Sequence, residues 1–269
     1  MIVSHKHRYV YVEVPRTGST AVSRELRDEY DGTPILRKHA TYRDFLRQAT
    51  EDERRYFVFS GIRNPLDIAV TRYAHMKVNA KGHFTNPEDM AVRNSIAGRV
   101  ERRIFRWVHD NDADFESFLL RWYRVPYDTW TSLDHKRMDK VIRFESLADD
   151  FTDALGRIGI TPTRPLPVHN ATPGRDRDFV ASYTPRAIKR AVWVFGPYME
   201  EWGYSFPDSW GRVRVPRSAK LMMRILRVFR GIYWKYFRFA DYTRRRPGGM
   251  LGNPRPPTPT RAPAEEHTG

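Results

Sequence analysis

The segment at residues 15–20, Pro-Arg-Thr-Gly-Ser-Thr, has the composition of an anion-binding loop. Arg16 supplies a fixed positive charge, and Gly18 lets the backbone approach an anion closely. Ser19 and Thr20 add hydroxyl donors. A helix N-cap beside a turn glycine has a similar composition, so these six residues alone leave both interpretations open. The first glycine and the Gly-Lys pair of a Walker A loop are absent, which disfavours a nucleotide triphosphatase.

A second candidate anion site follows in Arg63-Asn64-Pro65. Thr71 lies eight residues after Arg63, roughly two turns along the same expected helix and near its side. Helix N-termini that follow strands bind phosphates because unpaired backbone N–H groups and the helix dipole point at the same spot. Two such strand ends on one sheet suit a ligand with phosphates at both ends.

Both segments lie where an expected strand gives way to a helix. β-branched and aromatic runs, each followed by helical apolar spacing, predict three strand-helix units: residues 9–14 with 21–30, 56–62 with 66–76, and 141–144 with 147–158. Near-continuous apolar strands suit a sheet that is covered on both faces. We therefore expect an α/β fold with a doubly wound, P-loop-like parallel sheet and helices on both faces.

The rest of the chain gives fewer signals. Thr41-Tyr42-Arg43-Asp44 resembles a capping box at the start of a short helix. Residues 78–112 are polar and weakly periodic, and we expect an irregular insertion there that forms the acceptor wall. After residue 160 we expect a Pro-rich connection, a polar loop, a helix and a closing segment, at 161–167, 169–178, 185–195 and 202–204.

Four segments, in this order and element context, resemble motifs of the sulfotransferase superfamily, closest to its carbohydrate type and the bacterial relatives of that type. They are residues 15–20, 63–65, 143–147 (Arg-Phe-Glu-Ser-Leu) and 202–204 (Trp-Gly-Tyr). The resemblance covers residues 5 to about 206. It implies in-line transfer of a sulfuryl group from 3′-phosphoadenosine 5′-phosphosulfate to a hydroxyl of a carbohydrate or glycolipid, with no metal required.

The resemblance also implies roles for individual residues. In that family the first loop grips the 5′-phosphosulfate, here Pro15, Arg16, Thr17, Gly18, Ser19 and Thr20. The second segment grips the 3′-phosphate, here Arg63 and Thr71, and Asn64, Pro65 and Tyr73 match the same pattern. Arg16 would also stabilise charge on the leaving group. Three positions depart from the pattern: Arg16 replaces lysine, Ile68 stands where relatives often have arginine, and Thr71 replaces serine.

His39 is the expected general base. It precedes the capped helix, relatives carry a histidine in a similar Lys-His-x-Thr context, and imidazole titrates near neutral pH. His169 and Glu145 are the alternatives, although Glu145 at a strand end also suits a structural role. Arg175 and Arg177 suit either a lid over the 3′-phosphate or a solvated loop.

Composition limits the class of protein. A chain of 269 residues with 40% hydrophobic residues suits one catalytic domain. The absence of cysteine excludes disulfides, thiolate metal sites and cysteine nucleophiles, and it fits a reducing compartment. Residues 1–7 leave no room for an apolar signal-peptide core, and no long uncharged apolar stretch suggests a spanning helix. We expect a cytoplasmic protein, with peripheral contact at the inner face of the membrane left open.

The net charge of +15 is concentrated at the C-terminal end. Residues 212–269 contain fourteen Lys and Arg and three acids, a net +11, which leaves +4 for residues 1–211. We expect a sulfotransferase domain at 1–211, a basic amphipathic helical extension at 212–243 and a disordered Pro-rich tail at 244–269.

The expected helix at residues 217–239 has a basic side and an apolar side. The basic side holds Lys220, Arg224, Arg227, Lys235 and Arg238, and the apolar side holds Leu221, Ile225, Leu226, Phe229, Ile232, Tyr236 and Phe237. Such a helix suits an anionic membrane surface. It equally suits docking of its apolar side on the domain or in a homodimer.

Nucleic acid is not an expected partner, because the core carries only +4 and no reading module is recognised. The competing hypothesis to an enzyme is a non-catalytic nucleotide- or nucleic-acid-binding protein on the same scaffold. A nucleotide-dependent kinase is disfavoured by the missing Gly-Lys pair.

Overall fold

The computed structural model describes residues 1–36, 38–79, 82, 84–86, 96–129, 132–167 and 178–233. The strands are β1 (Ile2–Ser4), β2 (Tyr9–Val12), β3 (Thr33–Pro34), β4 (Phe57–Ile62) and β5 (Lys140–Arg143). The α-helices are α1 (Ser19–Glu29), α2 (Tyr42–Leu46), α3 (Pro65–Val78), α5 (Ile96–Asp110), α6 (Phe115–Trp122), α7 (Leu147–Arg157), α8 (Pro185–Glu201) and α9 (Arg217–Ile232). Short 3-10 helices are η1 (Glu53–Arg55), η3 (Ser132–Arg137), η4 (Phe144–Ser146), η5 (Phe179–Ser182) and η6 (Asp208–Trp210). His169, Arg175, Arg177 and the tail at 244–269 lie outside the described residues.

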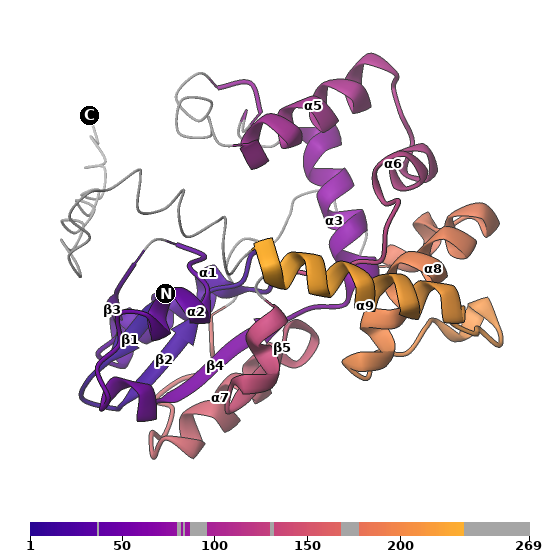
Figure 1. Ribbon diagram of the computed structural model, residues 1–269. Coiled ribbons are helices and arrows are strands. Elements are labelled where there is room, and N and C mark those ends of the chain that lie inside the picture. The colour runs from indigo at the N-terminus through magenta and orange to yellow at the C-terminus, as the bar shows by residue number, and fades with distance from the viewer. Residues whose placement is uncertain are drawn as a thin grey trace, which may run out of the picture.

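The sheet is mixed, with strand order β3-β1-β2-β4-β5 (Figure 1). β2, β4 and β5 are parallel, whereas β1 is antiparallel to both β2 and β3. The prediction of a parallel sheet is therefore correct for its centre and wrong for its β1–β3 edge. The cause is the turn at residues 5–8, which joins β1 directly to β2 and is too short for the crossover that parallel strands need.

Helices cover both faces of the sheet, as predicted. On β2, Tyr9 and Tyr11 point to one face, where α1 and α7 pack, and Val10 and Val12 point to the other, where α2 packs. This alternation follows from the two-residue period of a strand. The capping box predicted at Thr41 is confirmed at the start of α2, where the Thr41 and Asp44 side chains each bond the other residue's backbone N–H.

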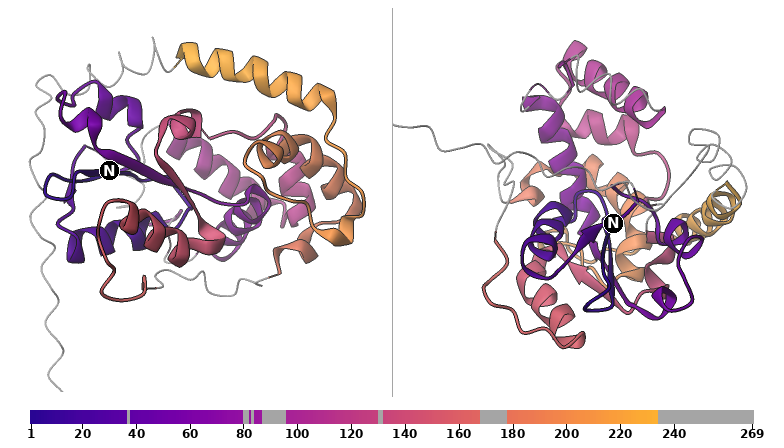
Figure 2. Two further views of the ribbon diagram at one scale, coloured as in Figure 1. Left: turned by 90° about the horizontal axis from the view of Figure 1, so that it is seen from below. Right: turned by 90° about the vertical axis from the view of Figure 1, so that its left-hand side faces the viewer.

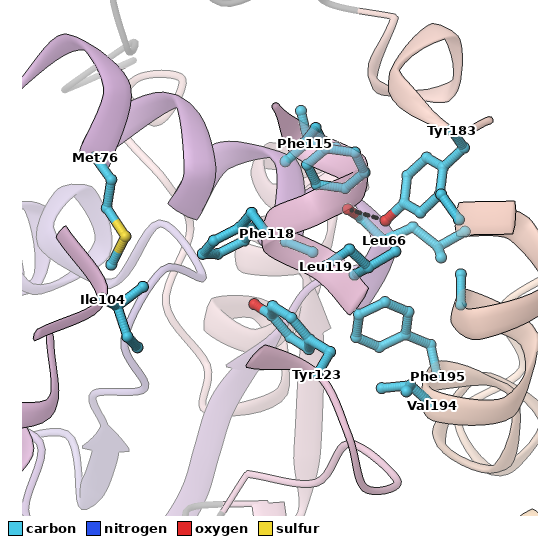
Figure 3. Packing of buried hydrophobic residues seen from close by; sticks show 14 of the residues in the cluster. Leu66, Met76, Ile104, Phe115, Phe118, Leu119, Tyr123, Tyr183, Val194 and Phe195 are labelled. Atoms are coloured by element: carbon cyan, nitrogen blue, oxygen red, sulfur yellow. Dashed lines mark hydrogen bonds between the residues drawn. The ribbon is translucent and has the colours of Figure 1, made fainter. Parts of the chain in front are cut away.

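A second core lies beyond the sheet, between α3, α5, α6 and α8 (Figure 3). In it the Tyr183 hydroxyl donates to the Leu66 carbonyl at 2.9 Å. The prediction of an irregular insertion at 78–112 is wrong for α5. Ile104, Phe105 and Val108 recur on one side of that helix and are buried, so burial of this narrow stripe stabilises a segment whose other sides are strongly charged.

The three predicted strand-helix units are confirmed as β2–α1, β4–α3 and β5–α7. α8 begins at Pro185 as predicted but continues to Glu201, beyond the predicted end near 195. α9 runs along the outside of the molecule and packs on α8 (Figure 2). Of the described helices, none is both long enough and apolar enough to cross a membrane.

Candidate functional site

The candidate site lies at the carboxyl edge of the three parallel strands. Val12 pairs with Ser60, and Ile62 pairs with Arg143, so β2, β4 and β5 end at the same edge of the sheet. The loop at 15–18, the start of α3 and the short helix η4 therefore meet there. This edge is where open α/β sheets bind ligands.

The loop before α1 presents unpaired backbone donors. Gly18 is the N-cap residue in a left-handed conformation (φ 74°), and no side chain caps the helix. Among the described residues, no protein group accepts a hydrogen bond from the backbone N–H groups of 16–20. The first turn of α1 contains no acidic residue. This helix end is accordingly open and electropositive.

The loop is held tightly from two sides. A Cβ atom at Gly18 would lie 2.5 Å from Leu147 Cδ2, and a Cβ atom at Gly61 would lie 2.7 Å from Thr17 Oγ1. Thr17 is buried and its hydroxyl donates to the Val14 carbonyl at 2.9 Å. The Thr17 hydroxyl therefore donates its hydrogen bond to the backbone just before the loop. Ser19 is buried and Thr20 is exposed at the start of α1.

Arg63 connects the loop to α3. Its Nη1 donates to the Arg16 carbonyl at 3.1 Å, and its Nε donates to Asp67 Oδ2 at 2.7 Å. Its Nη2 donates to the Thr71 hydroxyl at 3.0 Å, and its guanidinium lies 4.0 Å from the centre of the Phe144 ring. Only 5% of Arg63 is exposed. The side chain therefore fixes the backbone of Arg16, which itself has a left-handed φ of 68°.

The other residues predicted around the 3′-phosphate also have protein partners. Asn64 caps α3, with Oδ1 accepting from the Leu66 N–H at 3.0 Å, and Pro65 is the first residue of that helix. The Tyr73 hydroxyl donates to the Ala113 carbonyl at 2.9 Å, and its ring packs on Phe115 and Phe118 in the helical core. Ile68 is buried. The 3′-phosphate roles of Arg63 and Thr71 stay predictions.

Arg72, which was not among the predicted site residues, shares a carboxylate neighbour with Arg16. Glu101 Oε1 is 3.3 Å from Arg72 Nη2 and 3.9 Å from Arg16 Nη2, so this α5 carboxylate lies between two cations. The Nε of Arg72 is buried with no hydrogen-bond partner. Arg72 directly follows Thr71 in a helix that was predicted, but Glu101 lies in the segment that was interpreted as irregular.

His39 is held against the carboxyl end of β2. Its Nδ1 is 3.0 Å from the Glu13 carbonyl, an acceptor, so Nδ1 carries the proton. Nε2 has no hydrogen-bond partner in the part of the chain that the structure describes. Burial lowers the pKa of His39 from its ordinary value of 6.5, although the bond to the Glu13 carbonyl opposes this. The neutral imidazole thus leaves the Nε2 lone pair available at neutral pH.

Glu145 has a structural set of partners. Its Oε1 accepts from the Asn64 N–H at 2.6 Å and its Oε2 accepts from the Tyr204 hydroxyl at 3.1 Å. Arg143 donates to the Trp202 carbonyl at 2.5 Å and lies 4.7 Å from the centre of the Tyr204 ring. All four motif segments are thereby brought to one edge of the sheet.

Within the described ranges, no three His, Asp or Glu side chains are grouped as they would be to hold a metal ion. No protein-family model, no curated protein and no solved structure matches the chain.

Proposed function

We propose that this chain is a sulfotransferase that moves a sulfuryl group from 3′-phosphoadenosine 5′-phosphosulfate to a hydroxyl of a carbohydrate or glycolipid. The observation that carries the proposal is the open end of α1, with the unpaired N–H groups of residues 16–20 beside Arg16. A phosphosulfate group is a multiply charged anion, and such a helix end is an anion site.

The charge around Arg16 suits a reaction in which negative charge develops on a leaving group. Arg16 and Arg72 flank the Glu101 carboxylate, so these three side chains together carry a net positive charge. Preorganised donors of this kind stabilise the transition state because they need no reorientation during the reaction. Arg63 contributes by fixing the Arg16 backbone rather than through a free guanidinium.

His39 suits the role of the base. When the donor is bound, its sulfur would form a bond to the acceptor oxygen as the bond to the leaving phosphate breaks. The acceptor proton would pass to Nε2 of His39, while Nδ1 keeps its hydrogen bond to the Glu13 carbonyl. A carbonyl that fixes the tautomer also fixes which ring nitrogen can accept. Glu145 is a weaker candidate because both of its oxygens already accept hydrogen bonds.

A hollow on α6 and α8 supports a carbohydrate acceptor that carries acidic groups. It has a volume of about 290 Å³ and is lined by Leu120, Arg186, Lys189, Arg190 and Trp193. The Trp193 indole offers an apolar face for a sugar ring, and the exposed Lys189 offers a cation for a carboxylate or sulfate group, whereas Arg186 pairs with Glu116 at 3.1 Å. Arg190 donates to the Tyr123 carbonyl at 3.1 Å, and the Tyr123 ring lies 5.9 Å from the Arg72 guanidinium. Tyr123 therefore lies between Arg190, which lines the hollow, and Arg72 on α3.

Calorimetry and a transfer assay test the proposal together. The full chain should bind 3′,5′-ADP without magnesium, and Arg16→Gln should weaken that binding. With labelled donor, the chain should sulfate at least one member of a panel of acidic and neutral polysaccharides and glycolipids. Tight binding of ATP with magnesium, and none of 3′,5′-ADP, would contradict the proposal. Binding of 3′,5′-ADP without transfer to any acceptor would instead favour a non-catalytic nucleotide-binding protein.

A further inference from the structure

α9 carries a continuous apolar stripe that faces away from the protein. Of the ten strongly exposed large apolar side chains in the described residues, seven belong to α9 or directly follow it: Leu221, Met222, Ile225, Val228, Phe229, Ile232 and Tyr233. Val228 is 62% exposed and Phe229 is 65% exposed. At about 100° per residue these side chains share one side of the helix. An exposed stripe of this kind marks an interaction surface.

The opposite side of α9 docks on the protein through charge. Arg227 Nε donates to Asp128 at 2.7 Å, and Arg227 Nη1 donates to Glu201 at 2.8 Å. Lys220 pairs with Glu200 at 2.6 Å. Ala219 and Met223 are the buried apolar residues of this side. Docking of the apolar side on the domain, one of the arrangements expected from the sequence, is therefore not what the structure has.

Two cations border the apolar stripe without sharing in this docking. Arg217 and Arg224 are exposed and fall on one edge of the stripe. The chain then continues beyond the described residues with five aromatic residues and a basic cluster, Trp234, Tyr236, Phe237, Phe239, Tyr242 and then Lys235, Arg238, Arg244, Arg245 and Arg246. Exposed apolar side chains bordered by cations on α9 suit the headgroup region of an anionic bilayer.

Two other groups could cover the apolar stripe, the C-terminal residues 244–269 and a second copy of the chain, and both fit it less well. Residues 244–269 contain only Met250 and Leu251 as large apolar side chains, so they offer little apolar cover. A second copy of the chain would bring another row bordered by Arg217 and Arg224 against the first, and like charges repel. We therefore infer that α9 lies in the plane of an anionic phospholipid surface, with its apolar stripe in the lipid and its Arg227 side on the protein.

Vesicle sedimentation with the full chain tests this inference independently of any transfer activity. The chain should sediment with vesicles of equal parts phosphatidylcholine and phosphatidylserine, much less with phosphatidylcholine alone, and less at high salt. The double variant Val228→Ser/Phe229→Ser should reduce the partition by about tenfold, because two side chains lose their apolar burial. The matched control Val100→Ser/Val125→Ser changes two exposed valines outside α9 and should bind as the parent does.

Three results would overturn the inference. The first is a parent chain that does not sediment with anionic vesicles, or that binds neutral vesicles equally well. The second is a Val228→Ser/Phe229→Ser variant with unchanged binding and an unchanged thermal melt. The third is a dimer in light scattering that this variant converts to a monomer, because a second copy would then cover the stripe.

Discussion

At the scale of single residues, Arg16 and Arg63 lie in contrasting environments. Arg16 is partly exposed beside unpaired backbone donors, with Glu101 at 3.9 Å as its carboxylate neighbour. Arg63 is buried, pairs with Asp67 at 2.6 Å and bonds the Arg16 carbonyl. One arginine therefore faces the site, and the other fixes the backbone from which the first extends.

Replacing His39 tests its proposed role as the base. His39→Gln should leave the dissociation constant for 3′,5′-ADP nearly unchanged and lower turnover by about two to four orders of magnitude, as loss of a general base does. His7→Gln is the matched control, since His7 pairs with Asp31 on the exposed hairpin turn. Turnover that survives in His39→Gln would exclude this histidine as the base.

The pH dependence of turnover follows from the lowered pKa of His39. Because burial favours the neutral ring, the rate should reach its plateau by neutral pH and fall below a pKa under 6.5. The unfolded chain then binds a proton more readily than the folded chain, so the stability contributed by neutral His39 is lost as pH falls from 6.5 through the lower pKa of the folded chain. A rate that keeps rising above pH 8 would contradict this assignment.

The Glu101 carboxylate should weaken anion binding by its position between Arg16 and Arg72. Glu101→Gln should tighten 3′,5′-ADP binding by roughly three- to tenfold at low salt. The variant removes a negative charge 3.9 Å from Arg16, and unit charges about 4 Å apart interact by about 1 kcal/mol in water and more near a protein. The effect should shrink at high salt. Calorimetry at two salt concentrations measures it, with Glu51→Gln at an exposed position outside the candidate site as control. Weaker binding in Glu101→Gln would mean that the carboxylate positions Arg16 instead.

Much of the candidate site could be proposed from the sequence, because local order places it. Pro15–Thr20 and Arg63-Asn64-Pro65 follow strands, and parallel strands bring their carboxyl ends together. The Glu101–Arg72 pair could not be proposed, since it joins residues on two helices whose packing no local pattern specifies. Of the partners of Arg63, Thr71 was expected near it from the helical spacing, and the hydrogen bond between them confirms this. The Arg16 carbonyl is distant in sequence and could not be proposed.

At the scale of elements, the Arg63–Asp67 pair joins the first turn of α3 to the loop before α1. Asp67→Asn should lower the free energy of unfolding by about 3–5 kcal/mol, because it leaves a buried guanidinium without its counter-charge. Urea denaturation measures this. Asp52→Asn is the control, because its pair with Arg8 is exposed and should contribute little to stability. Equal losses in the two variants would contradict the structural role of Arg63.

α8 carries the prediction about the acceptor. Lys189→Ala should raise KM for an acidic polysaccharide by about two- to fivefold, because one exposed ion pair changes a binding constant by about that factor. KM for a neutral acceptor should stay unchanged. Steady-state kinetics with both acceptors measures the difference. Lys6→Ala on the hairpin turn is the matched control. An equal change for both acceptors would exclude the hollow as an acidic-group site.

Hydrophobic periodicity in the sequence predicted some of the strands and helices and missed others. Strands such as β4 are long enough to display their apolar character. β1 has three residues and β3 has two, too few to show any period, so the antiparallel edge could not be predicted. α5 was not predicted because it contains more arginines than buried residues. Only Ile104, Phe105 and Val108 follow the spacing of a helix with one apolar side.

At the scale of the whole molecule, Arg227 holds α9 against the body. Arg227→Met should increase the population in which α9 is detached by about ten- to a hundredfold, because it removes charge-assisted hydrogen bonds that contribute about 1.5–3 kcal/mol. Limited trypsin digestion should then cleave within α9 faster, with the body intact. Arg224→Met, at an exposed position, is the control. Equal cleavage rates in parent and Arg227→Met would show that other contacts hold the helix.

The hydrogen bond between Tyr204 and Glu145 has a consequence for synthesis. The carboxyl edge of the sheet is closed by Tyr204 and Trp202, which bond β5 and its following turn from 59 residues away. Arg164 likewise reaches back 139 residues to Glu25 on α1. A chain with such distant contacts folds slowly, since loop closure precedes the gain. A ribosome must therefore release most of the chain before the edge can close, and until then the nascent strands expose apolar side chains and unpaired backbone groups.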